Sequence, residues 1–244
     1  MKLAYLSESA DLSPYAMSAV LVDDEQWPKV YAASKQFRMG LKRDFSISPG
    51  DELRIPDLAR SINDGEAPRF GRMVLSSCAQ FLPSLPITVV GVVSKEGGDS
   101  VESLRKRAFP VLMHRIGRDS DFHGEYRFVV VCNQEIEKDI RAVSRRIRVY
   151  NPLPGVGNIP VSDLIEDSFV RDEKASHLLK SAELAAFLYR ALYLFRSDKE
   201  EILLSQYDLL DREYVYRIFY VWSEKGILME RASLSNKYGM VTIR

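Results

Sequence analysis

Apolar runs of two kinds alternate along the chain. The first kind is short and typical of strands, and occurs at residues 3–6, 15–22, 87–93 and 127–132. Of these, 87–93 is a near-continuous β-branched run, typical of a strand buried on both faces. The second kind is longer, with apolar residues at helical spacing, and occurs at 25–37, 70–82, 101–116, 136–147, 178–195 and 211–224. Strands that alternate with helices in this order predict an α/β protein with a mixed sheet.

Several details of this pattern make specific predictions. The first two strands are separated only by a short turn, which predicts an N-terminal hairpin. Pro110 is expected to kink or split the helix at 101–116. Residues 160–170 read as a strand with one polar face, and 228–231 with 240–243 as a closing hairpin. The most apolar helix, 178–195, marks the centre of a core over 1–196, with 197–244 as an extension packed on it.

Composition limits the classes of function. The 244 residues carry equal numbers of acidic and basic side chains, so no global field attracts nucleic acid, and any such contact needs a local basic patch. Candidate patches are the arginines between 141 and 148, the cluster at 105–107, and a group downstream of it at His114, Arg115 and Arg118. The usual reading of such runs is a solvated surface.

The spacing of the cysteines and the length of the apolar stretches bear on the cellular compartment and on zinc binding. The two cysteines are far apart in sequence, which is typical of a reducing compartment, and no zinc-ligand spacing occurs. No apolar stretch of about 20 residues is present, so we expect a cytoplasmic protein that does not span a membrane.

Three polar residues stand where the core is expected to continue. Glu8 follows the first strand, Asn133 follows the strand that ends at Cys132, and Glu183 lies inside the apolar helix. Ligands of open α/β sheets gather beyond the carboxyl ends of strands, so we expect these side chains to share one cleft. Carboxylates in such a cleft hold the Mg²⁺ or Mn²⁺ that phosphodiester hydrolysis uses. The candidate catalytic residues are therefore Glu8, Asn133 and Glu183, with Glu8 and Glu183 as metal ligands.

Each of these residues also has a structural reading. Glu8 could be a turn residue at the surface, and Asn133 could simply cap the helix that follows it. Glu183 could form an ion pair with Lys180 or Arg190. The sequence leaves both readings open.

Five segments of the chain together carry a family resemblance. They are Tyr5-Leu6-Ser7-Glu8-Ser9-Ala10, Glu52-Leu53-Arg54-Ile55, Val89–Val93 with Lys95, Phe128–Asn133, and a stretch from Asp172 through Lys174 and Ser176 to Ala186. In these segments the chain resembles the family known as domain of unknown function 3800. The resemblance implies a ribonuclease H-like mixed sheet flanked by helices, and metal-dependent cleavage of nucleic acid. It also adds Ser7, Arg54, Lys95, Asp172, Lys174, Ser176 and Lys180 to the candidate cleft.

The chain departs from that family pattern at its acidic positions. Ser7 and Asn133 stand where the family carries aspartates, Glu183 replaces the helix aspartate, and Lys180 replaces a glutamine. Two functions follow: a metal-dependent nuclease or phosphodiesterase, or an inactive module that kept the fold and binds nucleic acid or protein. If no metal binds, repulsion in the cleft predicts a cation beside Glu183, supplied by Lys180, Lys174 or Lys95.

Overall fold

A computed structural model describes residues 1–10, 13–49, 53, 55–58, 67–95, 99–123, 127–153, 157–172, 176–205, 207, 210–229 and 238–243. Its strands are β1 (Lys2–Ser9), β2 (Ala16–Asp23), β3 (Thr88–Ser94), β4 (Phe128–Cys132), β5 (Pro152–Leu153), β6 (Gly157–Asn158), β7 (Phe169–Val170) and β8 (Met240–Ile243). Its α-helices are α1 (Trp27–Phe45), α2 (Ile55–Leu58), α3 (Ala67–Phe81), α4 (Val101–His123), α5 (Gln134–Ile147), α6 (His177–Arg196), α7 (Glu200–Leu204) and α8 (Arg212–Glu224).

Six of these strands form one mixed sheet in the order β7-β4-β1-β2-β3-β8. The predicted hairpin of β1 and β2 is confirmed, and β3 continues the antiparallel pairing beside β2. β4 runs parallel to β1, and β8 runs parallel to β3. The fold is therefore the α/β mixed sheet flanked by helices that the sequence predicts.

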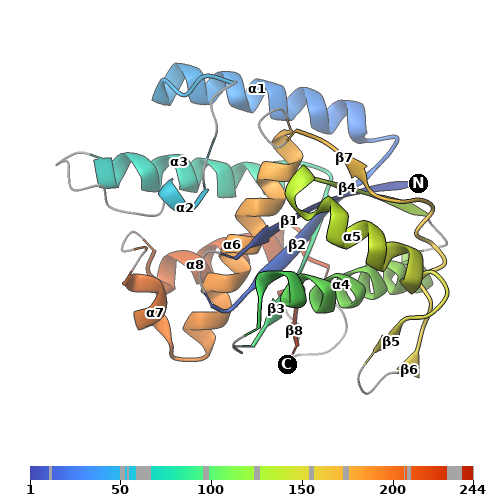
Figure 1. The fold of residues 1–244 in the computed structure, drawn as a ribbon. Helices are drawn as coiled ribbons and strands as arrows, with labels where there is room; N and C mark the ends of the chain where they lie inside the picture. Colours follow the sequence, from blue (N-terminus) through green and yellow to red (C-terminus); the bar gives the residue numbers. More distant parts are fainter. Residues whose placement is uncertain are drawn as a thin grey trace.

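Helices cover both faces of the sheet (Figure 1). One hydrophobic core lies between the sheet and α1, α3, α6 and α8, and the other lies between the sheet and the pair α4 and α5. Successive residues of a strand point to opposite faces, so the side chains of β1 alternate between the two cores. Tyr5 belongs to the first core, whereas Ala4 and Leu6 belong to the second.

Helix α6 lies directly against the centre of the sheet. Nearly all of its apolar residues belong to the first core or pack against it, which is why the sequence is apolar on nearly every side of this helix. Two contacts bring helix and sheet close together. The Ser18 hydroxyl donates a 2.6 Å hydrogen bond to the Ala182 carbonyl, and Gly91 of β3 lies under the Tyr189 ring.

Two predicted elements differ from the observed ones. In the segment predicted as a strand over 160–170, only Phe169–Val170 is a strand, while Leu164 makes a single bridge to Phe128. The predicted closing hairpin is wrong, because β8 pairs with β3 in parallel and Leu228 makes its own parallel bridge to Val89. The backbone N–H and C=O groups at this edge of β3 thus form their hydrogen bonds within the sheet.

Helix α4 continues through Pro110, so this proline does not split the helix. The short helix α7 was not predicted. Within the described parts of the chain, no helix is long and apolar enough to cross a membrane.

We expect Gly91→Ala to lower the free energy of unfolding by roughly 1–3 kcal/mol, the usual cost of overpacking a core. A Cβ at this position would lie 2.3 Å from the nearest atom of the fully buried Tyr189 ring. Urea unfolding measures the change. Gly40→Ala in α1 is the matched control, because a Cβ there meets nothing within 4 Å. Since alanine favours helix over glycine, the control is expected to be neutral or slightly stabilising. Equal stability of the Gly91→Ala variant and the native chain would contradict the packing of α6.

Candidate functional site

Ser7 and Glu8 end β1 with their side chains on opposite faces of the sheet. Ser7 continues the row of Tyr5 and is buried on the α6 side, where it pairs across the strands with Ser18. Glu8 continues the row of Leu6 toward α4 and α5. The hydroxyl, and not the carboxylate, therefore faces helix α6.

Glu8 is held by Arg105 of α4 and by Tyr15, which directly precedes β2. Arg105 donates to both carboxylate oxygens, at 2.8 and 2.6 Å, and the Tyr15 hydroxyl donates to Oε2 at 2.7 Å. Arg105 also forms an ion pair with Asp139 of α5. The side chains of Glu8, Arg105 and Asp139 are 15%, 12% and 16% exposed, so this cluster is largely shielded from water.

In this cluster Arg105 stays charged and Tyr15 stays neutral. The hydrogen bond to Glu8 raises the pKa of Arg105, which therefore stays a cation. Burial, and then the nearby Glu8 carboxylate, raises the pKa of Tyr15 well above its ordinary value, so its hydroxyl stays protonated and donates. A forked guanidinium and a hydroxyl thus fill the positions around Glu8 where a metal ion would need open oxygen lone pairs.

Asn133 caps helix α5. Its side-chain oxygen accepts a 3.2 Å hydrogen bond from the Ile136 amide, which satisfies one of the unpaired N–H groups at the start of the helix. Val131 pairs with Tyr5, and Asn133 and Ser7 each follow two residues later, at the carboxyl end of the same parallel strands.

Glu183 has the neighbouring cation that the sequence predicts. Lys180 Nζ lies 2.8 Å from Glu183 Oε2, and the two side chains are 14% and 15% exposed. The alternative partner, Arg190, is fully buried with its guanidinium over the rings of Phe187 and Tyr207. Lys95 is exposed at the end of β3.

Glu8 and Glu183 do not share the single cleft that we expected. Glu8 contacts the α4 and α5 layer, while Glu183 lies on α6, which packs on the other face of the sheet. The physical reason is the alternation of side chains along β1, which brings Ser7 to the face of α6 and turns Glu8 away from it.

The other candidates have varied environments. Ser176 caps α6 by accepting from the Leu179 amide at 3.3 Å, and Asp172 is exposed after β7. Arg54 and Lys174 lie outside the described residues. Of the described positions taken from the family resemblance, Lys180 forms an ion pair with a candidate ligand, Glu183.

The residues present do not fit a Mg²⁺ or Mn²⁺ site. Such ions need several oxygen ligands with free lone pairs, but Glu8, Asn133 and Glu183 each already accept from a neighbouring donor. Among the described residues, no three histidine, cysteine, aspartate or glutamate side chains are placed to hold a metal ion together.

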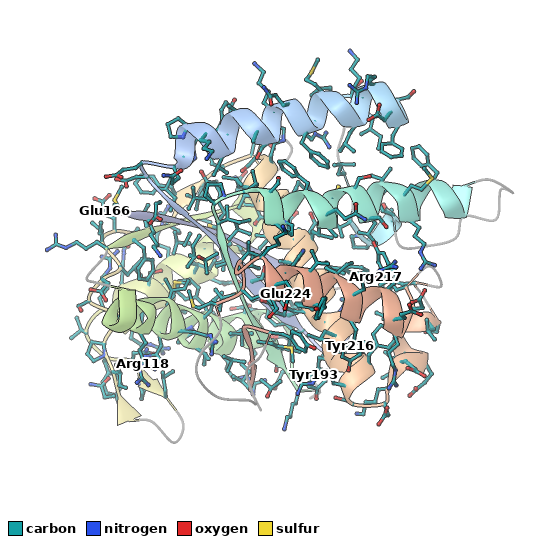
Figure 2. The ribbon with its side chains drawn as sticks, turned by 180° about the vertical axis from the view of Figure 1, so that it is seen from behind. Arg118, Glu166, Tyr193, Tyr216, Arg217 and Glu224 are labelled. Atoms are coloured by element: carbon teal, nitrogen blue, oxygen red, sulfur yellow. The ribbon has the colours of Figure 1, made fainter. Side chains whose placement is uncertain are left out.

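A second candidate site is a groove on the α4 and α5 side of the sheet, which we call the basic groove. Its basic side chains come from α4 and α5 and are Lys106, Arg107, His114, Arg115 and Arg146. Its other walls come from residues 151–153 and β8. Within the described part of the chain, none of the residues that line it is acidic. Arg118 is exposed further along α4, beside the strands β5 and β6 (Figure 2).

The arginine cluster of α5 divides between two environments. Arg141 pairs with Glu137, and Arg145 and Arg148 both pair with Asp167. Arg146 instead lines the basic groove. The sequence shows only a cluster of four arginines. The packing of α5 beside α4 decides which of them pair with a carboxylate and which one lines the groove.

Sequence reasoning missed two buried cations. Arg105 was read as part of a phosphate-binding cluster, yet it is the partner of Glu8. Arg38 is 5% exposed on α1 and was not singled out. The signal was present, since Arg38 continues the buried face of α1 that includes Val30, Ser34 and Leu41.

Comparison with known proteins shows similarity only at the level of fold. No family model matches the chain, and no curated protein matches its sequence. Among solved structures it is similar to the ribonuclease H2 of Pyrococcus horikoshii OT3, at 11% identity over 93% of this chain and 89% of that one, with a TM-score of 0.37. It is also similar to a chain of the PCNA:RNase HII complex from Archaeoglobus fulgidus, at 12% identity over 97% and 100%, with a TM-score of 0.38.

Arg105→Met is expected to lower the free energy of unfolding at pH 7 by about 3–5 kcal/mol, because it leaves buried carboxylates without their cation. Adding Glu8→Gln to this variant is expected to recover part of the loss, since it removes one of those charges. Urea unfolding of both variants tests this. Arg107→Met removes an exposed ion pair to Asp99 and is expected to cost at most about 1 kcal/mol. Equal losses at 105 and 107 would contradict the assignment of Arg105 as a buried partner.

Millimolar Mn²⁺ is expected to leave the melting temperature unchanged, because a metal that binds only the folded state would raise it. The measurement is a thermal melt with and without MnCl₂ at matched ionic strength. A rise that disappears in Glu183→Gln would show that Glu183 still acts as a ligand, against the poor fit of these residues to a metal ion.

Proposed function

We propose that this protein binds nucleic acid on the basic groove and does not cleave it. The observation that carries the proposal is the charge of the groove: four cationic side chains and His114 line one surface, and none of the described residues that line it is acidic. Phosphate groups are the ligands that such a surface favours, through contacts that do not depend on base sequence.

The cations of the groove differ in how firmly they are held. Arg115 is 7% exposed and donates to the Met229 carbonyl at 2.8 Å, so it forms part of the floor. Lys106 and Arg107 are exposed and pair with Glu102 and Asp99. Exposed ion pairs contribute little to stability, so a phosphate can replace the carboxylate at small cost.

The position of the groove suits an extended polyanion. Arg146 enters from α5, Lys106 and Arg107 from α4, and the apolar residues of β8 form the opposite wall. Because the chain has no net charge, attraction is confined to this local surface. Binding should therefore weaken steeply as salt screens and competes with the phosphates.

The paired carboxylates support binding without hydrolysis. Metal-assisted cleavage needs carboxylates that converge on a cation and on the scissile phosphate. Here the salt bridge from Arg105 occupies Glu8, and the salt bridge from Lys180 occupies Glu183, on the other side of the sheet. The positions that the family resemblance marks as acidic hold Ser7 and Asn133.

We expect the triple variant Lys106→Gln, Arg107→Gln, Arg146→Gln to bind a labelled 20-nucleotide duplex or single strand at least about tenfold more weakly. For this variant, the slope of log K against log salt concentration should be shallower by up to about 0.9 for each phosphate that it no longer neutralises. Fluorescence anisotropy between about 50 and 200 mM salt measures the affinity and its salt dependence for DNA and RNA.

Lys35→Gln, Arg43→Gln, Arg217→Gln is the matched control, since it removes the same charge from exposed positions on α1 and α8. It is expected to bind like the native chain. Equal losses of affinity in the two triple variants would refute the groove. Incubation of the same oligonucleotides with Mn²⁺ is expected to give no product, and cleavage that disappears in Glu183→Gln would replace the proposal with the nuclease.

A further inference from the structure

One side of the basic groove is an apolar wall that contacts with phosphates leave unused. Its residues come from α4, β5 and β8, and are Pro110, Val111, Pro152, Leu153, Val241 and Ile243. Val111, Val241 and Ile243 are only half-buried, and they pack against the core between the sheet and the helices α4 and α5. Pro152 is exposed. A ligand that places apolar surface against this wall removes these side chains from water, which favours the complex.

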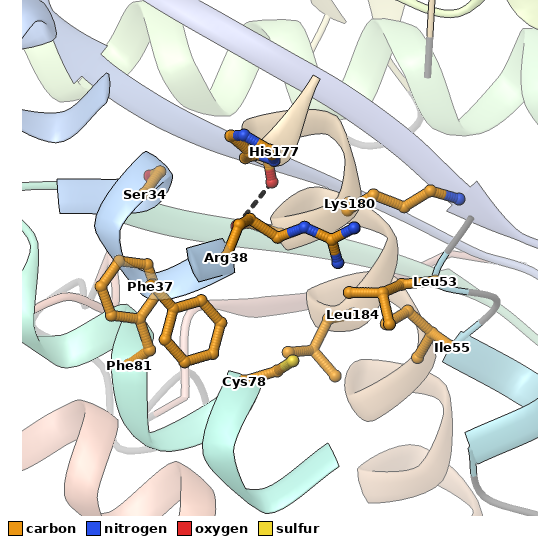
Figure 3. Close-up of a pocket in the computed structure, with 11 residues that line it drawn as sticks. Ser34, Phe37, Arg38, Leu53, Ile55, Cys78, Phe81, His177, Lys180 and Leu184 are labelled. Carbon is orange, nitrogen blue, oxygen red and sulfur yellow. Dashed lines mark hydrogen bonds between the residues drawn. The ribbon is translucent and has the colours of Figure 1, made fainter. Parts of the chain in front are cut away.

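The basic groove has room for a group of the size of a nucleotide. Its free volume is about 560 Å³, and sites for small molecules typically have about 300–1,000 Å³. The cavity between α1, α3 and α6 on the other face of the sheet, which Figure 3 shows, has a free volume of only about 40 Å³. Of these two hollows, the groove is therefore the one that can take in a base together with its sugar and phosphate.

Two cations of the groove are available to phosphates. Arg146 is exposed on α5, and among the described residues no carboxylate pairs with it, whereas its neighbours Arg145 and Arg148 both pair with Asp167. Lys106 pairs with Glu102 one helical turn away, and both side chains are exposed. Since an exposed pair of this kind contributes little to stability, Lys106 can exchange its carboxylate for a phosphate.

The free edge of β8 adds hydrogen-bonding groups beside the apolar wall. β8 is the last strand of the sheet on this side, and the Ile243 and Gly239 carbonyls accept from Lys95 and Gly91. Because peptide groups alternate in direction along a strand, the N–H and C=O of Thr242 point away from β3. Thr242 is exposed and lines the groove. It offers one donor and one acceptor side by side, which is what the edge of a nucleobase requires.

A double helix makes poor use of these features. Its bases are stacked and paired, so only sugars and phosphates reach a protein surface unless a base is first taken out of the stack at an energetic cost. The bases of a single strand can turn outward without that cost. A single strand can therefore place phosphates on the cations of the groove and a base on the apolar wall at the same time.

We propose that the basic groove is a site for single-stranded nucleic acid. Lys106 and Arg146 hold phosphates, an unpaired base lies against the apolar wall, and the peptide groups of Thr242 form hydrogen bonds with the edge of that base. This inference rests on the proposed function and goes beyond it, because it names the form of nucleic acid that the groove prefers and the part of the ligand that decides the preference.

Three labelled ligands of about 20 nucleotides test the proposal on the full chain at about 100 mM salt: a single strand, its duplex, and a strand of the same length in which abasic sites replace the bases. Fluorescence anisotropy is expected to show that the single strand binds at least about tenfold more tightly than the duplex. The abasic strand is expected to bind at least about fivefold more weakly than the normal strand, because it carries the same charge but no bases to bury.

The outcomes separate this inference from the proposed function. A duplex that binds as tightly as the single strand, or an abasic strand that binds as tightly as the normal one, would overturn the single-strand preference and leave the groove as a phosphate-binding surface. No binding of any of the three ligands at about 50 mM salt would instead refute the proposed function, and this inference with it.

The double variant Val111→Gln, Pro152→Gln locates the base on the apolar wall. It keeps the charge of the groove but makes the wall polar, so it is expected to weaken single-strand binding about fivefold and to leave duplex binding unchanged. Unchanged duplex binding also shows that this variant is folded. Leu204→Gln, Val221→Gln, at exposed positions of α7 and α8, is the matched control and is expected to bind both ligands normally. Equal single-strand affinity of the wall variant and the native chain would contradict the proposal, and the abasic strand tests it without any variant.

Discussion

The close packing of helix α6 on the sheet is the constraint on which the other features of this protein depend. Gly91 removes a side chain where the Tyr189 ring must lie, and the Ser18 hydroxyl satisfies the Ala182 carbonyl at the interface. Since the helix is apolar on nearly all sides, it excludes water from this face and becomes the centre of the larger core. Its position then determines where Lys180 and Glu183 lie.

Charge in this molecule is largely satisfied within the protein. Arg105 holds Glu8 and Asp139 on one face of the sheet, and Lys180 holds Glu183 on the other. A buried carboxylate without a partner is costly, and a fixed cation offsets that cost. The ion pairs explain how the protein keeps Glu8 and Glu183 partly buried.

The two faces of the sheet offer surfaces of different character. The side of α4 and α5 carries an open groove with exposed, weakly paired cations, which suits a large polyanion. The side of α1, α3 and α6 carries a small cavity lined by Arg38, Lys180 and the stacked rings of Phe37 and Phe81. The sheet lies between these two surfaces.

Most of the elements and the fold class could be predicted from the amino-acid order, because apolar periodicity records which face of each strand and helix is buried. The same order indicated that a cation would accompany Glu183, since Lys180 lies one helical turn away. Alternation along β1 could have shown that Ser7 and Glu8 point apart. The folded structure was needed to show that Arg105, 97 residues away, is the partner of Glu8, and that Arg38 lines a cavity with Lys180. Such pairings depend on how helices are placed across the sheet, and local sequence patterns do not encode contacts between segments so far apart.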